Sequence, residues 1–348
     1  MGLQIIVRTP NHLGDCIMAL PMINEVRESH PGSTVTVLTP DYLAELFEHS
    51  PAVDAVFKIP AKYVHGLISV VKIKEIIAPH EFDLGYILPP SFGAAAGFKL
   101  GGVKERVGYI ADGRRLLLSR PLPLPTPLNC QHRAVTYFDL LRRATGLDME
   151  FGLPKILVNE QDMVKGNDVL AANGVPSDKR LAIVAFQAAA ESRRWGQSNY
   201  EALIRCLLES HDFHVVLVGG EADQRVGDDI ISALGSQRVA NVAGKSNLRE
   251  SAAIMSRGSV FVGNDSGPAH LAAAVDIPVV VLSGADDPQE TSPLARTKCI
   301  IRRAELDCIS CVKNKCPLSG DKVMRCMTEI SVLEVVAEIE KILLERPV

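Results

Sequence analysis

The sequence lacks several signatures that would point directly to common classes of enzyme or membrane protein. No Asp-x-Asp occurs in its 348 residues, and no Gly-x-Gly-x-x-Gly follows the expected first strand of either half. These two absences disfavour a diphosphate held by a metal ion and a dinucleotide-dependent dehydrogenase. No run of about 18 apolar residues is free of charge, and the first residues do not form a signal peptide. We therefore expect a soluble, unsecreted protein.

Charge and composition narrow the class further. The formal net charge is −4, which argues against a dedicated nucleic-acid-binding protein. Hydrophobic residues make up 47% of the chain and charged residues 22%, so a large core can form. A chain of this length is expected to form two domains. Its eight cysteines indicate thiols or a metal site, because an unsecreted protein rarely carries a disulfide scaffold.

Strand-like and helix-like segments alternate in both halves of the chain. This alternation predicts an α/β protein with two parallel, doubly wound, Rossmann-like sheets. Residues 119–128 contain four prolines and are expected to be an irregular surface connection. The domains are expected over 1–160 and 161–330, and the helix over 331–348 is a candidate to pack back across their junction. The expected strands are 4–10, 34–40, 55–60, 84–90 and 105–110, then 181–187, 214–220, 239–244, 259–265 and 279–284.

The stretch 260–284 has the pattern of a strand, a tight turn, a helix and a second strand. A helix start in such a turn favours an anionic group, because its N–H groups and dipole face the turn. Gly263 and Gly267 would allow close backbone approach and unusual φ angles, and Ser266 would cap the helix. Asp265 would orient the loop or accept a ligand hydroxyl. A capped turn without any ligand explains the same residues.

A second candidate site follows the first expected strand. Asn11 to Gly14 form a turn, and Asp15 stands where the first helix begins. In open α/β sheets the ligand crevice lies at the carboxyl ends of the strands, so Asp15 would point into it. A carboxylate at a helix start is also a common structural cap, and both interpretations stay open.

Four motifs follow one another in sequence order. The first is Arg8 with Gly14-Asp15 and Ala-Leu-Pro, and the second is Arg193-Arg194-Trp195. The third runs from Gly219 to Asp223 and the fourth from Gly263 to His270. Together they resemble those of glycosyltransferase family 9, the bacterial ADP-heptose:lipopolysaccharide heptosyltransferases, in which Lys-x-Trp is usual at the second motif. Within the family, the cysteine-bearing tail is most similar to the heptosyltransferase II branch. One departure is the segment 187–190, where family members often have a Pro-Gly-Ala turn with hydroxyl residues.

The resemblance implies a GT-B fold, with two Rossmann-like domains facing across a cleft. The N-terminal domain would bind the acceptor and the C-terminal domain the nucleotide sugar. The reaction would transfer L-glycero-D-manno-heptose from ADP-heptose to the lipopolysaccharide inner core, with inversion and without a metal or other cofactor. The enzyme would be cytoplasmic and would touch the inner membrane peripherally, with no nucleic-acid partner.

The resemblance also implies roles for individual residues. Asp15 corresponds to the general base, and Arg193 replaces the lysine that contacts the donor phosphates. The acceptor-side candidates are Gly14, in the turn before Asp15, and the basic residues Lys99, Lys104 and Arg106, which would meet an anionic acceptor or simply form a solvated face. The remaining donor residues are Asp223 for the ribose, Ser246 near the adenine, and Asp265, Ser266, Gly267 and His270 on the diphosphate loop, although His270 also fits an interior histidine.

The C-terminal cysteines form a separate pattern. Cys308, Cys311, Cys316 and Cys326 lie within nineteen residues, with spacings that match no common zinc ribbon. We favour structural or free thiols and keep zinc or an iron–sulfur cluster as the alternatives.

Two other functions use the same fold and a diphosphate loop. A nucleotide-sugar 2-epimerase would need acid and base groups aimed at the sugar, and no matched set is evident in the sequence. A non-catalytic nucleotide-sugar-binding protein would not need Asp15.

Overall fold

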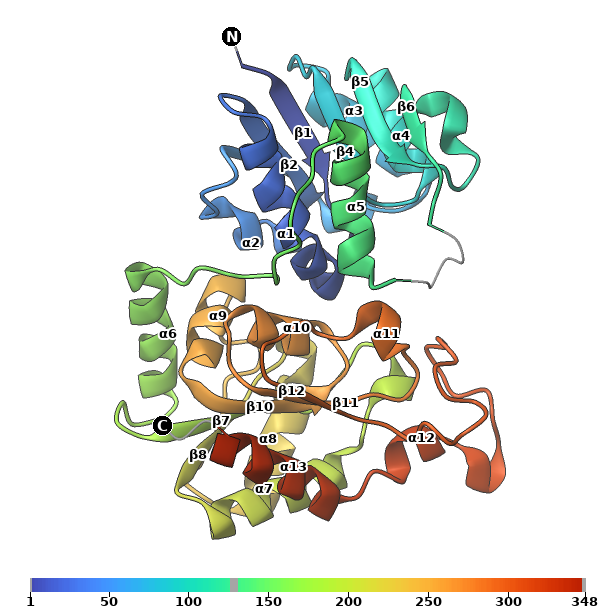
Figure 1. Cartoon of the computed structure of the whole chain (residues 1–348). Helices are drawn as coiled ribbons and strands as arrows, with labels where there is room; N and C mark the ends of the chain where they lie inside the picture. The colour runs from blue at the N-terminus through green and yellow to red at the C-terminus, as the bar shows by residue number, and fades with distance from the viewer. Residues whose placement is uncertain (1, 126–130, 346–348) are drawn as a thin grey trace. The chain divides into compact units, whose positions relative to one another are not determined.

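The chain folds into two compact units that divide after Pro154 (Figure 1). The structure is a computed structural model that describes residues 2–125 and 131–345. Each unit contains one six-stranded parallel sheet with helices packed on its two faces. The predicted fold class is therefore confirmed: both units are Rossmann-like and doubly wound, as in the GT-B fold.

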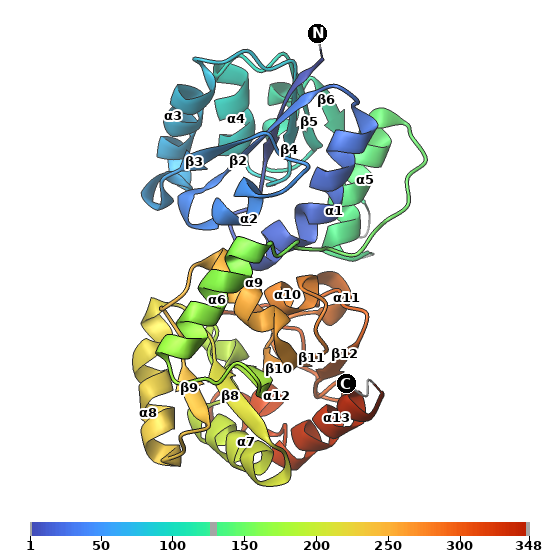
Figure 2. The ribbon, with the colours of Figure 1, turned by 90° about the vertical axis from the view of Figure 1, so that its left-hand side faces the viewer.

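The first unit has the strand order β3-β2-β1-β4-β5-β6. β1 lies at its centre, where Ile5 pairs with Val35 on one side and Leu84 on the other. The helices α3 and α4 cover one face of the sheet, and α1 and α5 cover the other (Figure 2). Its strands are β1 (Gln4–Arg8), β2 (Thr34–Pro40), β3 (Ala55–Ile59), β4 (Leu84–Ile87), β5 (Glu105–Tyr109) and β6 (Arg120–Leu122), and its helices are α1 (Leu13–Ser29), α2 (Glu45–Glu48), α3 (Gly66–Ile77), α4 (Phe92–Leu100) and α5 (Arg133–Thr145).

The second unit repeats this topology, with the order β12-β11-β10-β7-β8-β9. The helices α6, α9 and α10 pack together, and α7 packs against α8 and α13. Its strands are β7 (Arg180–Ala185), β8 (Phe213–Leu217), β9 (Val239–Asn241), β10 (Gly258–Asn264), β11 (Val279–Leu282) and β12 (Lys298–Ile301), and its helices are α6 (Glu160–Ala172), α7 (Gln197–Ser210), α8 (Gln224–Leu234), α9 (Leu248–Ser256), α10 (Gly267–Ala274), α11 (Pro288–Thr291), α12 (Arg325–Thr328) and α13 (Val332–Glu345).

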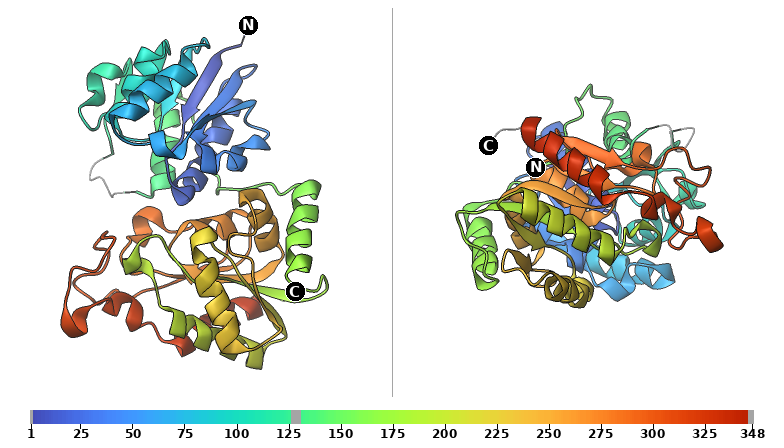
Figure 3. Two further views of the ribbon diagram at one scale, coloured as in Figure 1. Left: turned by 180° about the vertical axis from the view of Figure 1, so that it is seen from behind. Right: turned by 90° about the horizontal axis from the view of Figure 1, so that it is seen from below.

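The second unit includes the residues just before α6 and the C-terminal helix. Before α6, the N–H of Ile156 donates to the carbonyl of Ala274 at the end of α10. The C-terminal helix α13 packs beside α7 (Figure 3). Val335, Ile339 and Ile342 on one face of α13 are buried in the core of the second unit. The apolar stripe of this helix therefore has a packing partner within its own unit.

Two short edge strands depart from the expectation. The proline-rich stretch was expected to be irregular, yet its first residues form β6, while residues 126–128 lie outside the described residues. Pro121 is tolerated because β6 is an edge strand, so one side of its backbone needs no partner. β12 was not predicted, because four residues carry too little periodicity to identify a strand.

The described helices differ from those that cross a bilayer. A spanning helix needs about 20 predominantly apolar residues. Within the described ranges, no helix has the length and apolar character to cross a membrane.

Candidate active site

Both sheets change strand order at one point, and three predicted site residues lie there. In such sheets ligands bind outside the carboxyl ends of the strands, at the position where the order reverses. The reversal lies between β1 and β4 in the first unit and between β7 and β10 in the second. Asp15 follows β1, Arg193 follows β7, and Asp265 follows β10. These candidates thus stand where open α/β sheets bind their ligands.

The turn after β10 differs in detail from the expectation. Ser266 occupies the N-cap position of α10 but makes no side-chain capping bond, because its hydroxyl donates to the carbonyl of Asn264 at 3.2 Å. Gly263 and Gly267 do not have positive φ angles. Gly263 is needed for close packing instead, since a Cβ there would lie 2.9 Å from the carbonyl oxygen of Ala185. Close backbone approach is therefore found at Gly263, whereas the predictions of an unusual φ at these glycines and of a Ser266 side-chain cap were wrong.

Asp265 is buried at the base of this turn. It is 4% exposed and accepts a hydrogen bond of 2.8 Å from the hydroxyl of Ser283. Burial raises the pKa of its carboxyl group to about 6, and the nearby carboxylate of Asp286 adds to the effect. His270, in the helix that follows, is buried as well. A buried carboxylate with a hydroxyl donor suits a loop-orienting role.

The raised pKa of Asp265 predicts a pH-dependent contribution to stability. An acid with a higher pKa in the folded state favours folding below its unfolded pKa of 3.8, and this contribution is lost as the pH rises through about 6. Above that pH the ionised group costs on the order of 2–3 kcal/mol. Asp265→Asn should therefore match the wild type in unfolding free energy near pH 4 and exceed it near pH 7.5. Denaturant titrations of both proteins at both pH values test this prediction. If the variant and the wild type differed in unfolding free energy by the same amount at both pH values, the prediction would be wrong.

Arg193 is held by a carboxylate that the sequence analysis did not single out. Its Nη2 donates to Asp286 Oδ1 at 2.7 Å, and its Nε lies 2.5 Å from Asp286 Oδ2. Asp286 is itself buried and belongs to the loop between β11 and α11. One hydrogen bond and one ion-pair contact hold the guanidinium group beside Asp286, while 31% of the Arg193 side chain stays exposed. The arginine is therefore both oriented and accessible.

Trp195 ties the Arg193 loop to the end of β10. Its backbone N–H donates to Asn264 Oδ1 at 3.0 Å, and its indole N–H donates to the carbonyl of Ile330 at 2.9 Å. The ring is 2% exposed and packs edge-on against Tyr200. Trp195 is thus a core anchor, and its backbone joins two loops of the candidate site.

Two other predicted donor residues lie on loops at the same sheet edge. Asp223 accepts a hydrogen bond of 2.9 Å from a backbone N–H in the turn after β8, which closes that turn. The hydroxyl of Ser246, after β9, lies 2.8 Å from that of Ser251 in α9. The two loops meet where the N–H of Gly244 donates to the carbonyl of Gly219. Asp223 and Ser246 therefore both lie at the carboxyl ends of strands in the second sheet.

Asp15 has two partners from α5 in the first unit. It lies with Gly14 in the first turn of α1, whose N-cap is His12, so Asp15 is not the cap residue. Its Oδ1 accepts from Arg133 Nη1 at 3.0 Å and from the hydroxyl of Tyr137 at 3.4 Å. The Asp15 side chain remains 16% exposed. A carboxylate in this position can accept a proton while its neighbours hold it in place.

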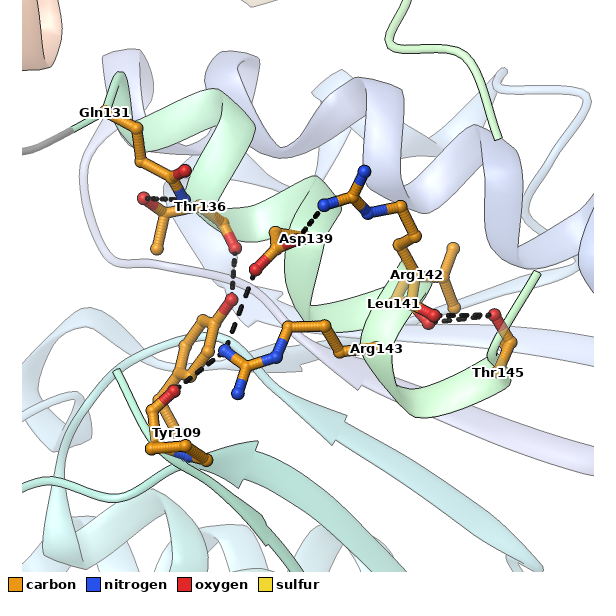
Figure 4. A network of polar contacts seen from close by, with 9 residues as sticks. Tyr109, Gln131, Thr136, Asp139, Leu141, Arg142, Arg143 and Thr145 are labelled. Atoms are coloured by element: carbon orange, nitrogen blue, oxygen red, sulfur yellow. Dashed lines mark hydrogen bonds and ion pairs between the residues drawn. The ribbon is translucent and has the colours of Figure 1, made fainter. Parts of the chain in front are cut away.

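A polar network fixes α5 against the sheet (Figure 4). The hydroxyl of Tyr109 on β5 donates to the carbonyl of Thr136 at 2.9 Å. Asp139 pairs with Arg142 at 2.8 Å and with Arg143 at 3.7 Å, and Arg143 lies over the ring of Tyr109. The contacts of Tyr109 with Thr136 and Arg143 tie the helix that supplies both partners of the α1 carboxylate to β5.

The basic acceptor-side candidates lie at the amino edge of the first sheet, opposite the carboxyl edge where Asp15 lies. Lys104 forms an ion pair of 2.9 Å with Asp83, which precedes β4. Arg106 stands at the amino end of β5 and donates to backbone carbonyls nearby. Lys99 lies in the last turn of α4, the helix that leads to this end of β5. Because Asp15 stands at the carboxyl edge, the structure separates these three residues from it.

Comparisons with known proteins give the family of the chain. The sequence model of glycosyltransferase family 9 (heptosyltransferase) matches residues 70–321. The chain belongs to glycosyltransferase family 9. It is similar to lipopolysaccharide heptosyltransferase 2 of Escherichia coli strain K12, with 26% identity over 314 residues that cover 86% of this chain and 88% of the relative.

Solved structures of family 9 proteins share the fold of this chain. The structure of E. coli ADP-heptose lps heptosyltransferase II superposes with a TM-score of 0.80 at 23% identity, covering 99% of both chains. A family 9 glycosyltransferase from Veillonella parvula gives a TM-score of 0.85 at 20% identity, covering 99% of this chain and 98% of the other. As a family 9 member, the chain is a glycosyltransferase.

The cysteine-bearing segment of this family 9 chain lies against the Arg193 loop, although it is remote in sequence. The N–H of Ser192 donates to the carbonyl of Asn314 at 3.1 Å. The hydroxyl of Ser310 donates to the carbonyl of Asp286 at 3.1 Å. The segment thus supports both loops that position the Arg193 guanidinium group.

Three of the C-terminal thiols lie close enough to the fourth, Cys326, to affect its pKa. Burial raises the pKa of Cys326 to about 11, and Cys308, Cys311 and Cys316 add to the effect. Over the part of the chain that the structure describes, no group of three or more His, Cys, Asp or Glu side chains has an arrangement that could hold a metal ion. All four cysteines are free thiols in the structure.

Several partners of the site residues could not be identified from the motifs. Asp286 and Ser283 follow β11 at the carboxyl edge of the second sheet, and that position is the signal that could have identified them. Arg133 and Tyr137 carried no such signal, because they follow no strand end and reach Asp15 through helix packing.

Proposed function

We propose that this chain transfers L-glycero-D-manno-heptose from ADP-heptose to a hydroxyl of the lipopolysaccharide inner core, with inversion. The observation that carries this proposal is the convergence of Arg193, Asp265 and Asp286 at the carboxyl edge of the second sheet. Family 9 membership and the similarity to heptosyltransferase 2 proteins support the sugar and the acceptor. The heptosyltransferase II branch is part of the proposal.

The reaction requires a base and a stabilised leaving group. Asp15 takes the proton from the acceptor hydroxyl as that oxygen attacks the anomeric carbon. The bond between this carbon and the diphosphate oxygen breaks, and ADP leaves with the bonding electrons. Arg193 and the start of α10 offset the negative charge that develops on the diphosphate. An arginine can bind phosphate through two parallel hydrogen bonds, which the usual lysine cannot do.

The remaining donor residues complete the site in this proposal. Asp223 accepts from the ribose hydroxyls, and Ser246 lies near the adenine. The start of α10 and the turn before it hold the diphosphate and the sugar. The residues of that segment are Asp265, Ser266, Gly267 and His270.

The chemistry of the acceptor also indicates where in the cell the enzyme acts. The lipopolysaccharide acceptor is anchored in lipid, so the enzyme must reach sugars that lie close to a bilayer surface. We therefore propose that it works in the cytoplasm, peripherally at the inner membrane.

One assay separates this function from its alternatives. The purified chain is incubated with ADP-heptose and lipopolysaccharide that lacks the outer part of its core. Transfer of heptose to the acceptor is the expected result. Release of an epimerised sugar instead would indicate a 2-epimerase, and binding without turnover would indicate a non-catalytic protein.

Transfer is expected to survive removal of divalent cations. Because the sequence has no Asp-x-Asp, we expect Arg193 and the start of α10, and not a metal ion, to offset the negative charge on the diphosphate. Activity in excess EDTA should therefore match the untreated rate, and elemental analysis should find no stoichiometric zinc. Loss of activity that magnesium or manganese restores would refute the first expectation, and one zinc per chain would refute the second.

A further inference from the structure

The helices α3 and α4 form a tightly packed layer on one face of the first sheet (Figure 2). Glycines allow this contact: a Cβ on Gly97 would lie 2.6 Å from a methyl group of Ile73, and one on Gly101 would lie 2.8 Å from Ile77. The facing sides of the two helices are therefore in close contact. Their outer sides, with the 3-10 turn Arg114–Leu117, make one surface, which we call the α3–α4 surface.

The α3–α4 surface is unusually apolar for an exposed region. Leu67 on α3 is 82% exposed and Leu116 in the turn is 86% exposed. Leu67 and Val71 are one helical turn apart, so they share a face of α3. Apolar clusters of this kind on a protein surface commonly mark an interaction site. The other exposed apolar members are Ile68, Phe92 and Leu100.

Basic side chains surround these apolar groups. Over 61–78 the only acidic residue is Glu75, which pairs with Lys72 at 3.1 Å. This net positive charge is a property of the surface and not of the whole chain, which has a net charge of −4. A surface that is both apolar and cationic complements an anionic lipid headgroup layer with acyl chains beneath it. The other exposed basic residues of the surface are Lys62, Lys74, Lys99 and Arg115.

We propose that the α3–α4 surface docks the protein on the anionic surface of a phospholipid bilayer. Leu67 and Val71 enter the boundary between headgroups and acyl chains, and the basic side chains contact lipid phosphates. Lys74 lies two turns after Leu67 on the same face of α3, so apolar and cationic contacts form together. The start of α3 follows β3, which places this end at the same sheet edge as Asp15. Docking here brings the acceptor half of the enzyme to the membrane.

Vesicle co-sedimentation of the full chain tests the proposal. Vesicles of phosphatidylglycerol and phosphatidylethanolamine should bind the protein roughly tenfold or more tightly than vesicles of phosphatidylcholine, and added salt should weaken binding. Lys62→Gln with Lys74→Gln should weaken binding roughly tenfold. Leu67→Ser with Val71→Ser should weaken it by roughly tenfold or more, because less apolar surface enters the bilayer.

Matched variants on the second unit serve as controls. Leu333→Ser with Leu344→Ser removes apolar side chains that are 76% and 82% exposed, and Lys165→Gln with Lys341→Gln removes two exposed charges. These variants should bind vesicles as the wild type does. Absence of binding to anionic vesicles, or equal losses in the controls, would overturn the proposal.

Two further measurements separate this proposal from other outcomes. Size-exclusion chromatography detects self-association, and a dimer that Leu67→Ser with Val71→Ser dissociates would show that the surface joins two copies instead. The docking surface deepens the proposed location at the membrane and does not depend on heptose transfer. The α3 variants should therefore keep the wild-type transfer rate on a delipidated, soluble acceptor, and vesicle binding stands even if that assay detects no transfer.

Discussion

Replacing Asp15 with asparagine is expected to slow heptose transfer by about 10²–10⁴-fold, the usual contribution of a general base. The amide cannot take the proton of the acceptor hydroxyl, although it is nearly the same size. The affinity for ADP-heptose should remain largely unchanged, because the proposed donor residues belong to the other unit. Single-turnover transfer rates and calorimetric titration with ADP measure the two effects separately.

The partners of Asp15 decide how this result is interpreted. An asparagine oxygen can still accept from Arg133 and Tyr137, so the fold should be retained. Asp54→Asn is a matched control, because Asp54 is also a carboxylate of the first unit with an arginine partner, Arg27, and it lies before β3, away from Asp15. It should leave the transfer rate near the wild-type value. If Asp15→Asn also transfers heptose at that rate, Asp15 only joins α1 to α5 and the base lies elsewhere.

Arg193→Ala is expected to weaken donor binding by roughly 10–100-fold, since hydrogen bonds to charged groups contribute about 1.5–3 kcal/mol. The transfer rate should fall further, by roughly 10²–10³-fold, because the charge on the leaving diphosphate grows in the transition state. Arg193→Lys keeps the charge but loses the planar fork, so its losses should be intermediate. Donor affinity and single-turnover rates are the measurements.

Two neighbouring residues sharpen the test of Arg193. Asp286→Asn removes the carboxylate that orients the guanidinium group, so it should slow transfer less than Arg193→Ala does. Arg194→Ala is the control, because Arg194 donates from Nε to the backbone carbonyl of Ala188 at 2.8 Å. Unchanged affinity and rate in Arg193→Ala would refute the assignment. A larger loss in Arg194→Ala would assign the phosphate-binding role to that residue.

Local sequence pattern predicted most of the strands, because a strand needs only a short apolar run between turn residues. The exceptions are short edge strands: β6 contains Pro121, and β12 has four residues. Residues that follow a strand closely, such as Asp15 and Asp265, could also be identified from the sequence. The parallel fold places every such residue at one edge of its sheet, wherever the strand lies in the order.

Short-range pattern was thus enough to establish the two Rossmann-like halves, the family motifs and the strand ends that carry them. Which side chains meet at those ends depended on the packed fold. Asp286 reaches Arg193 across 93 residues, and Arg133 reaches Asp15 across 118. Periodicity and capping depend on residues a few positions apart, whereas these contacts depend on strand order and helix packing. For the same reason, the sequence did not show that the cysteine segment supports the Arg193 loop or that α3 exposes Leu67 on the same face as Lys74.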